Sequence, residues 1–387
     1  MEKMKETLIR EVESSAADLC KISEFLFQNP ETAFKEFKAC AYLSDFLKGQ
    51  GFAVEVGIGG LETAFFARPK IKQQERPTVA FLAEYDALPG VGHGCGHNLI
   101  AAASIGAALA LSRHLNEISG SIAVVGTPAE EGGGGKILLA EAGVFSDMDV
   151  AMMCHPGRLN LPGEEMLGRI KLKAEFFGRA AHASVSPDKG ISALDALIMA
   201  YNNINALRQT LRSDVRIHGV ITNGGDAPNV IPPYTAGLFY IRAATRDYLE
   251  EVFKKVQNCF AGAALATGAD YKIEIIPPSF DPIKRNPPLE QTVAQNMEIL
   301  NISIDQDDGR RGSSDIGNLS FYLPAVHLSL AIVDPETPGH SPIFAEATMS
   351  ERGRKALLNA AKILAMSAYD FLASPELQER VKKAFGG

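Results

Sequence analysis

The sequence contains few cysteines, and their arrangement argues against a disulfide framework. Only five of the 387 residues are cysteine, which is an odd number, and they lie far apart at positions 20, 40, 95, 154 and 259. This pattern predicts a reduced, cytoplasmic protein. Cys20, Cys40 and Cys259 fall in helical patterns and are expected to be buried small apolar residues.

Long apolar runs and a targeting segment are also missing. The longest apolar run, near residues 99–111, contains Ser104 and Gly106 and is shorter than the roughly 20 residues that span a bilayer. The first residues, MEKMKET, carry charges and no apolar core, which argues against a signal peptide. We therefore expect no membrane partner.

Basic clusters are absent as well. The formal net charge is −8 and the acidic residues are scattered, so no face is expected to bind nucleic acid or an acidic membrane surface. The apolar and charged fractions, 46% and 22%, are those of an ordinary globular protein. A chain of 387 residues exceeds what one hydrophobic core usually supports, which predicts two domains.

Continuous apolar runs predict strands that are buried on both faces. Three such runs occur in the first half of the chain, at residues 78–83, 121–126 and 149–154, and a fourth lies at 326–332. Helical patterns alternate with these runs, which predicts an α/β fold with a mostly parallel sheet flanked by helices. Asn98 is expected to be the N-cap of a helix over residues 99–115.

The pattern changes after residue 166. Residues 169–177 alternate between polar and apolar, as in a half-exposed antiparallel strand. The order through residue 276 is β-α-β-β-α-β, which predicts an inserted α+β domain of the ferredoxin-like type. We assign residues 1–166 and 281–387 to a catalytic metal-binding domain and residues 167–280 to the insertion.

Side chains that bind metals follow each of the four predicted buried strands. They are, in chain order, Asp86, Cys95 and His97, then Glu130 and Glu131, then His155, and finally His340. In an open α/β sheet the loops beyond the carboxyl ends of the strands form the binding crevice. We therefore expect these side chains to converge at one edge of the sheet.

The expected ligand set has one thiolate, three imidazoles and one carboxylate: Cys95, His97, Glu131, His155 and His340. Five ligands exceed one tetrahedral zinc and suit two divalent metal ions, with either Cys95 or a carboxylate as the bridge. The thiolate favours zinc, with manganese, cobalt and nickel as alternatives. Of the adjacent carboxylates at 130 and 131, one would bind metal and the other would act as general base.

The remaining histidines and the glycine-rich segment are open to other interpretations. His93 either supports the metal ligands or shapes the loop, His114 and His218 are expected to be structural, and His327 is expected to be a core or supporting residue. The segment 132–136 is not a phosphate-binding loop, because that motif requires Gly at 130 and Ser or Thr at 137.

Six motifs carry a family resemblance through nearly the whole chain: AEYDALP (83–89), GHGCGHN (92–98), GTPAEE (126–131), GRAAHAS (178–184), NVIP (229–232) and SSDIGN (313–318). With these motifs the sequence resembles the zinc-dependent aminoacylase/carboxypeptidase-G family of metallopeptidases, in its amidohydrolase branch. That branch includes p-aminobenzoyl-glutamate hydrolases, hydrolases of N-acyl amino acids and aminoacylase-like dipeptidases.

The resemblance implies the same five metal ligands, with Glu130 as the base and Asp86 orienting the metal site. Other branches carry a metal-binding histidine two residues before this aspartate, where the present chain has Glu84. Many relatives have Asp where this chain has Asn98, a difference expected to alter supporting hydrogen bonds and leave the mechanism intact.

The resemblance also implies that the inserted domain is a lid through which the protein forms a homodimer or larger homo-oligomer. His182 would stabilise the oxyanion of the tetrahedral intermediate, in its own subunit or in the neighbouring one. Asn229 and Arg242 would contact substrate, the arginine through a free carboxylate.

The predicted function is that of a dinuclear metal-dependent amidohydrolase. Its substrate would be an N-acyl or aminoacyl amino acid or a small dipeptide, with Glu130, Asp86 and His182 as catalytic residues. One alternative is a true dipeptidase or aminopeptidase, which would require a free amino terminus in its substrates. Another is a non-catalytic homologue that binds a metal or ligand.

Overall fold

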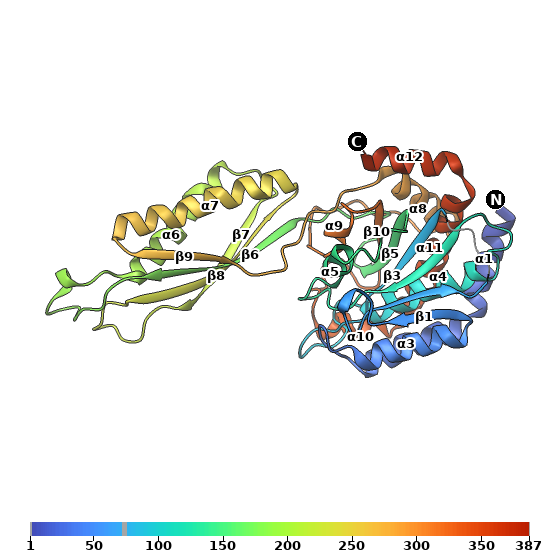
Figure 1. Cartoon of the computed structure of the whole chain (residues 1–387), viewed down its shortest axis with the longest axis horizontal. Helices are drawn as coiled ribbons and strands as arrows, with labels where there is room; N and C mark the ends of the chain where they lie inside the picture. The colour runs from blue at the N-terminus through green and yellow to red at the C-terminus, as the bar shows by residue number, and fades with distance from the viewer. Residues whose placement is uncertain (1, 72–75, 387) are drawn as a thin grey trace. The chain divides into compact units, whose positions relative to one another are not determined.

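The computed structural model describes residues 2–71 and 76–386, which form two compact units (Figure 1). The first unit runs to Glu165 and includes Ile283–Arg310 and the segment from Ser314 onward. The second comprises Met166–Pro282 and the short segment Arg311–Ser313. The predicted insertion at 167–280 lies inside the second unit, which extends one residue further at its start and two at its end.

The first unit is built on a six-stranded sheet. Its strands in spatial order are β1 (Phe52–Val56), β2 (Phe65–Pro69), β4 (Ser121–Gly126), β3 (Thr78–Ala83), β5 (Val150–Gly157) and β10 (Ala325–Ala331). The last four strands in this order are parallel, whereas β1 pairs with β2, and β2 with β4, in antiparallel fashion. The prediction of a mostly parallel sheet is therefore confirmed. Parallel pairing brings the carboxyl ends of β3, β4, β5 and β10 to the same edge.

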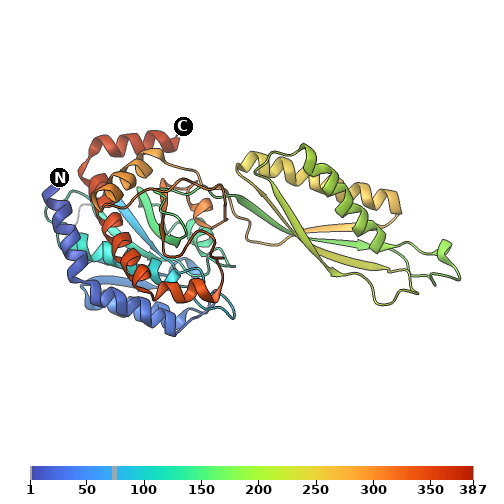
Figure 2. The same ribbon diagram turned by 180° about the vertical axis from the view of Figure 1, so that it is seen from behind.

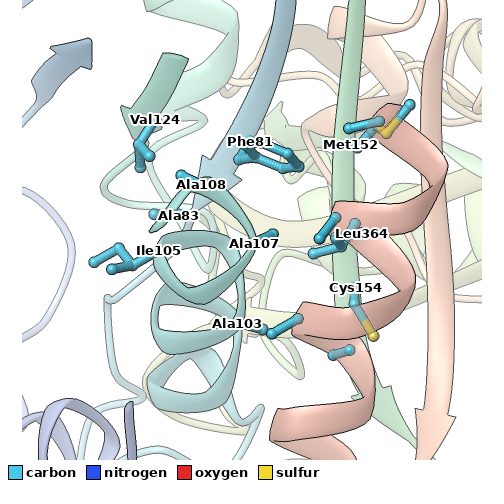
Figure 3. Packing of buried hydrophobic residues seen from close by; sticks show 14 of the residues in the cluster. Phe81, Ala83, Ala103, Ile105, Ala107, Ala108, Val124, Met152, Cys154 and Leu364 are labelled. Carbon is cyan, nitrogen blue, oxygen red and sulfur yellow. The ribbon is translucent and has the colours of Figure 1, made fainter. Parts of the chain in front are cut away.

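Two helices pack against the centre of this sheet, α4 (His97–Ser112) and α11 (Glu351–Ala373). Nearly every residue of α4 is buried, which agrees with its composition of alanine, leucine and isoleucine without charges. Small side chains allow the two helices to approach closely. Figure 3 shows Ala107 of α4 beside Leu364 of α11, with Phe81 and Met152 of the sheet nearby.

The other helices of the first unit surround this core. They are α1 (Glu2–Ser14), α2 (Ala16–Gln28), α3 (Phe37–Gly49), α5 (Gly135–Glu141), α8 (Pro287–Ile299), α9 (Ile316–Leu319), α10 (Pro342–Thr348), α12 (Pro375–Gly386) and the 3-10 turn η1 (Ile58–Gly60). Within the described ranges, α11 is the single helix long and apolar enough to cross a membrane by length and composition. Of its apolar window, 72% is buried, as is usual for a core helix.

The second unit has its own sheet and core. Its elements are β6 (Gly168–Phe177), η2 (Pro187–Lys189), α6 (Ala193–Leu207), η3 (Arg208–Thr210), β7 (Arg216–Asn223), β8 (Tyr234–Ala243), α7 (Arg246–Thr267) and β9 (Asp270–Ile275). All strand pairs are antiparallel, in the order β7-β8-β6-β9, and α6 and α7 cover one face (Figure 2). Their apolar side chains pack on Phe176, Phe239 and Ile241. This arrangement is the predicted ferredoxin-like α+β pattern.

Candidate active site

The loop after β3 supplies three of the predicted site residues. Asp86 is fully buried, and its Oδ1 lies 3.0 Å from Nδ1 of His97, the first residue of α4. A carboxylate can only accept here, so Nδ1 of His97 donates and Nε2 remains free for a metal. The turn into α4 requires Gly96, which has φ +81°, and a Cβ there would lie 2.3 Å from the ring of Pro156.

The loop after β4 carries Glu130 and Glu131. The backbone N–H of Glu131 donates to Oδ2 of Asp86 at 2.9 Å, so one aspartate contacts both ligand-bearing loops. Oε2 of Glu130 lies 3.9 Å from Nε2 of His97. Ala129, directly before the two glutamates, has φ +61°, an uncommon conformation for a residue with a Cβ.

The other two histidines come from β5 and from the loop after β10. His155 was expected directly after a strand, but β5 continues to Gly157 and includes it. Its Nδ1 lies 2.7 Å from the carbonyl oxygen of Pro156, and its Nε2 lies 3.5 Å from Sγ of Cys95. His340 donates its backbone N–H to the carbonyl of Gly94 at 3.1 Å, which ties its loop to the first one.

All five predicted ligands are close together. Cys95, His97 and His155 form one triad, and Cys95, Glu131 and His340 form a second, each with ligand atoms within 4.8 Å of one another. The Nε2 of His340 lies 3.5 Å from Oε1 of Glu131. Cys95 belongs to both triads, which is the arrangement expected of a residue between two metal positions. A third triad, His97, Glu130 and Glu131, places Glu130 beside the same group.

The sequence did not reveal the buried ion pairs behind the site. Nζ of Lys136 lies 2.5 Å from Oε1 of Glu84 and 2.7 Å from Oδ1 of Asp315, and all three side chains are buried. The other oxygen of Glu84 lies 3.3 Å from Nε2 of His97. Lys136 thus compensates a carboxylate that faces a predicted metal ligand. The signal available in the sequence was a lysine directly before the apolar residues 137–140 of a short helix.

Burial and charge shift the titration of the central groups. Burial raises the pKa of Glu130, and the carboxylates of Glu84, Asp315 and Glu131 raise it further. Burial lowers the pKa of His97, but Asp86 and Glu84 outweigh this effect and raise it well above its usual range. Both shifts favour the protonated form, because the side chains around these two groups carry more negative than positive charge.

Two further groups titrate far from their usual range. Burial, reinforced by the charge of Glu131, raises the pKa of the Cys95 thiol. Burial and the neighbouring His327 lower the pKa of His155 to about 4, so this imidazole is neutral near pH 7. A neutral imidazole is the form that coordinates a metal, whereas the thiol must lose its proton to do so.

The residues present fit divalent metal ions on three grounds. The donor set of sulfur, imidazole nitrogen and carboxylate oxygen is the one that zinc and related cations take. Among the described residues, Nε2 of His97 and Oε1 of Glu131 are buried without a hydrogen-bond partner, and a cation would satisfy both. The buried carboxylates also outnumber the charge of Lys136, and divalent cations would offset the remainder.

Asn98 is not the N-cap that we expected, because α4 begins at His97 with Gly96 as its N-cap, and Asn98 is fully buried in the first turn. Its amide nitrogen donates to Oγ of Ser23 at 2.9 Å and Oγ1 of Thr348 at 3.1 Å. Both hydroxyls accept a hydrogen bond from the neutral amide of Asn98, which explains how an asparagine is accommodated at this position. Nε2 of His93 lies 3.0 Å from the carbonyl of Leu26, so this histidine ties the metal loop to α2.

The three predicted substrate residues lie in the second unit. His182 and Asn229 are exposed and occupy paired segments, in which the N–H of Ala183 donates to the carbonyl of Asn229 at 3.0 Å. Arg242 is half-buried on β8 and donates to Oγ of Ser313 at 2.7 Å. Their roles, like those of the metal ligands and Glu130, stay predictions.

Comparison with known proteins places these features in a family. The model of peptidase family M20/M25/M40 matches residues 80–365. The chain is 36% identical to a mouse Xaa-Arg dipeptidase over 400 aligned residues, which cover 100% of the chain and 93% of the relative. It is 34% identical to one of the subunits of p-aminobenzoyl-glutamate hydrolase from Escherichia coli strain K12, over 66% of the chain and 57% of the relative.

Solved structures share the fold. A dinuclear metal binding peptidase of the M20 family from Bacillus subtilis superimposes with a TM-score of 0.75 at 20% identity, covering 93% of this chain and 99% of the other. An aminobenzoyl-glutamate utilization protein from Klebsiella pneumoniae superimposes with a TM-score of 0.71 at 20% identity, covering 95% and 99%.

Proposed function

Because the chain belongs to peptidase family M20/M25/M40 and is therefore a metal-dependent hydrolase of amide bonds, we propose that it cleaves aminoacyl or N-acyl amino acids with a free carboxylate. The observation that carries this proposal is the pair of triads that share Cys95, with Glu130 beside them. Dipeptides that end in arginine are the first candidates, since two Xaa-Arg dipeptidases, from mouse and human, resemble the chain over nearly its whole length.

We propose that two divalent ions, zinc first and manganese, cobalt or nickel as alternatives, are held by the triads around Cys95. Bound there, the ions would polarise the scissile carbonyl and acidify the attacking water, whose pKa falls from about 15.7 toward roughly 7 in such sites. Asp86 fixes the orientation and tautomer of His97, because its carboxylate accepts the Nδ1 proton.

Glu130 is the proposed general base. It contacts the ligand cluster through His97 and is not needed to complete either triad around Cys95, so its carboxylate is available for proton transfer. It would take a proton from the attacking water and deliver a proton to the nitrogen of the leaving amine. In the second unit, His182 would donate to the developing oxyanion, and Asn229 and Arg242 would bind the free carboxylate of the substrate.

The test is a substrate panel with metal-reconstituted protein. The protein would be stripped with chelator, reloaded with zinc or manganese, and assayed on Ala-Arg, N-acetyl-arginine and p-aminobenzoyl-glutamate. We expect loss of hydrolysis on stripping, recovery on reloading, and the highest kcat/KM on Ala-Arg. Equal activity with and without metal would contradict the proposal. Preference for N-acetyl-arginine would favour an acylase over a dipeptidase.

The second candidate is hydrolysis of p-aminobenzoyl-glutamate. It rests on the 34% identity to the Escherichia coli hydrolase, which covers 66% of the chain. The free carboxylate and the amide are common to both substrate classes, so the same catalytic residues would serve. The panel separates them, because a site that takes a basic terminal residue disfavours glutamate at that position.

We also propose a cytoplasmic, homo-oligomeric protein. All five cysteines are free, as in a reducing compartment. The second unit exposes apolar strand residues, including Val220 and Ile275, that a partner subunit could cover. Light scattering on the purified protein measures the subunit number, and cell fractionation tests the location.

A further inference from the structure

A buried carboxylate outside the predicted ligand set joins three segments of the first unit. Glu36, directly before α3, is 0% exposed. Its Oε1 accepts the backbone N–H of Phe34 at 2.9 Å and that of Ala129 at 3.0 Å, and its Oε2 accepts the hydroxyl of Thr63 at 2.9 Å. These partners belong to the loop after α2, the segment before β2 and the loop after β4. A side chain so fully engaged fixes the relative position of all three.

The bond to Ala129 is the one that bears on the reaction. Ala129 immediately precedes Glu130 and has φ +61°, a left-handed conformation that is unfavourable for a residue with a Cβ. Its carbonyl accepts the N–H of Gly133 at 2.9 Å and of Gly134 at 2.8 Å. Hydrogen bonds therefore hold Ala129 at both its N–H and its carbonyl, and Glu36 accepts the one from the N–H.

The loop between α2 and α3, which contains Glu36, contacts both loops that carry predicted metal ligands. The N–H of Ala87, next to Asp86, donates to the carbonyl of Glu31 at 2.7 Å. Phe34 has φ +60° and packs so closely on Gly133 that a Cβ there would lie 2.3 Å from its ring. Residues 31–36 thus contact the backbone on either side of the pair Glu130 and Glu131.

We propose that Glu36 is a positioning residue for the general base: it holds the peptide of Ala129 so that the Glu130 carboxylate stays at the reacting centre. The inference rests on the proposed function, in which Glu130 transfers the protons. Its hydrogen bonds within the described ranges go to Phe34, Thr63 and Ala129 and not to a predicted metal ligand, so it would act through the bond to the Ala129 backbone. Displacement of a catalytic group by about 1 Å can cost on the order of 100-fold in rate.

The chemistry of the site supplies matched variants. In Glu36→Gln the remaining carbonyl oxygen can still accept both N–H groups, while the new amide donates to the hydroxyl of Thr63, which accepts as well as donates. Glu36→Ala removes every bond. Glu36→Asp keeps the carboxyl group but is one methylene shorter and cannot reach all partners. Thr63→Val leaves the bond to Ala129 intact and serves as a control for lost stability alone.

The experiment compares these variants with wild type and Glu130→Gln in the full-length, metal-loaded protein. The readouts are kcat and KM on Ala-Arg, metal content, and amide hydrogen exchange of the segment 127–134. For Glu36→Ala we expect kcat to fall about 10- to 100-fold with KM changed less than about 2-fold, unchanged metal content and faster exchange at Ala129. Glu36→Gln and Thr63→Val should stay within about 3-fold of wild type in kcat.

Full kcat in a folded Glu36→Ala protein would overturn the inference, as would equal loss in Glu36→Gln or loss of metal along with activity. If Glu36→Ala does not fold, Glu36→Asp decides by the same criteria. The proposed function would instead be refuted if the wild-type protein hydrolysed none of the three substrates, or if Glu130→Gln were fully active. In that case unchanged exchange at Ala129 in the Glu36 variants would separately refute the positioning contact.

Discussion

Oδ1 of Asp86 lies 3.0 Å from Nδ1 of His97, and both side chains are buried. This contact directs the other ring nitrogen of the histidine toward Glu84 and Glu130. Through Oδ2 the same aspartate holds the backbone of Glu131. A single carboxylate therefore sets both the tautomer of one predicted ligand and the position of another.

Asp86→Asn should weaken metal binding about 10- to 100-fold, because the amide no longer offers a charged acceptor to His97. Calorimetric titration of the chelator-stripped protein with zinc measures the change. Asp45→Asn is a matched control, since Asp45 is exposed and pairs only at the surface with Lys48. Unaltered zinc affinity in Asp86→Asn would contradict the orienting role.

Glu130→Gln and Glu131→Gln should fail in different ways although the residues are adjacent. The first should retain metal and lose about 10²- to 10⁴-fold in kcat, because only the proton transfers are removed. The second should lose metal, because Glu131 belongs to a triad with Cys95 and His340. Metal content by mass spectrometry and steady-state kinetics on both proteins check this. Identical behaviour of the two variants would refute the division of roles.

Lys136→Met should destabilise the fold by about 3–5 kcal/mol, since it leaves Glu84 and Asp315 buried without their shared cation. Urea unfolding of the metal-loaded protein measures this loss. Lys48→Met removes an exposed lysine that pairs with Asp45 at 3.0 Å and should cost less than about 1 kcal/mol. A small effect in both variants would show that the buried network contributes little.

Glu36 should make stability depend on pH. Burial raises the pKa of Glu36 to about 7 from a usual value of 4.5. The folded protein therefore binds the proton more tightly than the unfolded chain, and stability is lost as the pH rises from about 4.5 through 7. Relative to Glu36→Gln, wild type should lose up to about 3 kcal/mol across this interval.

Urea titrations at several pH values measure the free energy of unfolding of both proteins. The other titratable groups are common to both, so their contributions cancel in the difference. Glu62→Gln, at an exposed glutamate, controls for the loss of one carboxylate. A difference between wild type and Glu36→Gln that is constant over pH 4.5 to 7 would show that Glu36 does not titrate in this interval.

The sequence predicted the strands and the neighbourhood of the site because both follow from local pattern. The continuous apolar run at residues 78–83 has the length of a strand, which favours a strand buried on both faces, and β3 has those bounds. The loops that follow such strands converge in any parallel sheet, which is why Cys95, His155 and His340 could be grouped before their distances were known.

Local pattern was misleading where a long-range contact competed with it. Asn98 has the side chain of a typical N-cap, but Ser23 and Thr348 bind it inside the first unit, and the helix begins before it. His155 was expected in a loop, yet pairing with β10 extends β5 past it. Tertiary hydrogen bonds outweighed local preference at both positions.

By itself the sequence determined the two-domain α/β organisation, the ferredoxin-like insertion and the set of side chains that meet near Cys95, since strand burial and loop position depend on residues near one another in the chain. Only the tertiary structure decided which groups support them. Lys136 meets Asp315 across 179 positions, and Glu36 meets Ala129 across 93. No periodicity encodes such pairs, because a buried polar group is satisfied by whichever partner the fold brings to it.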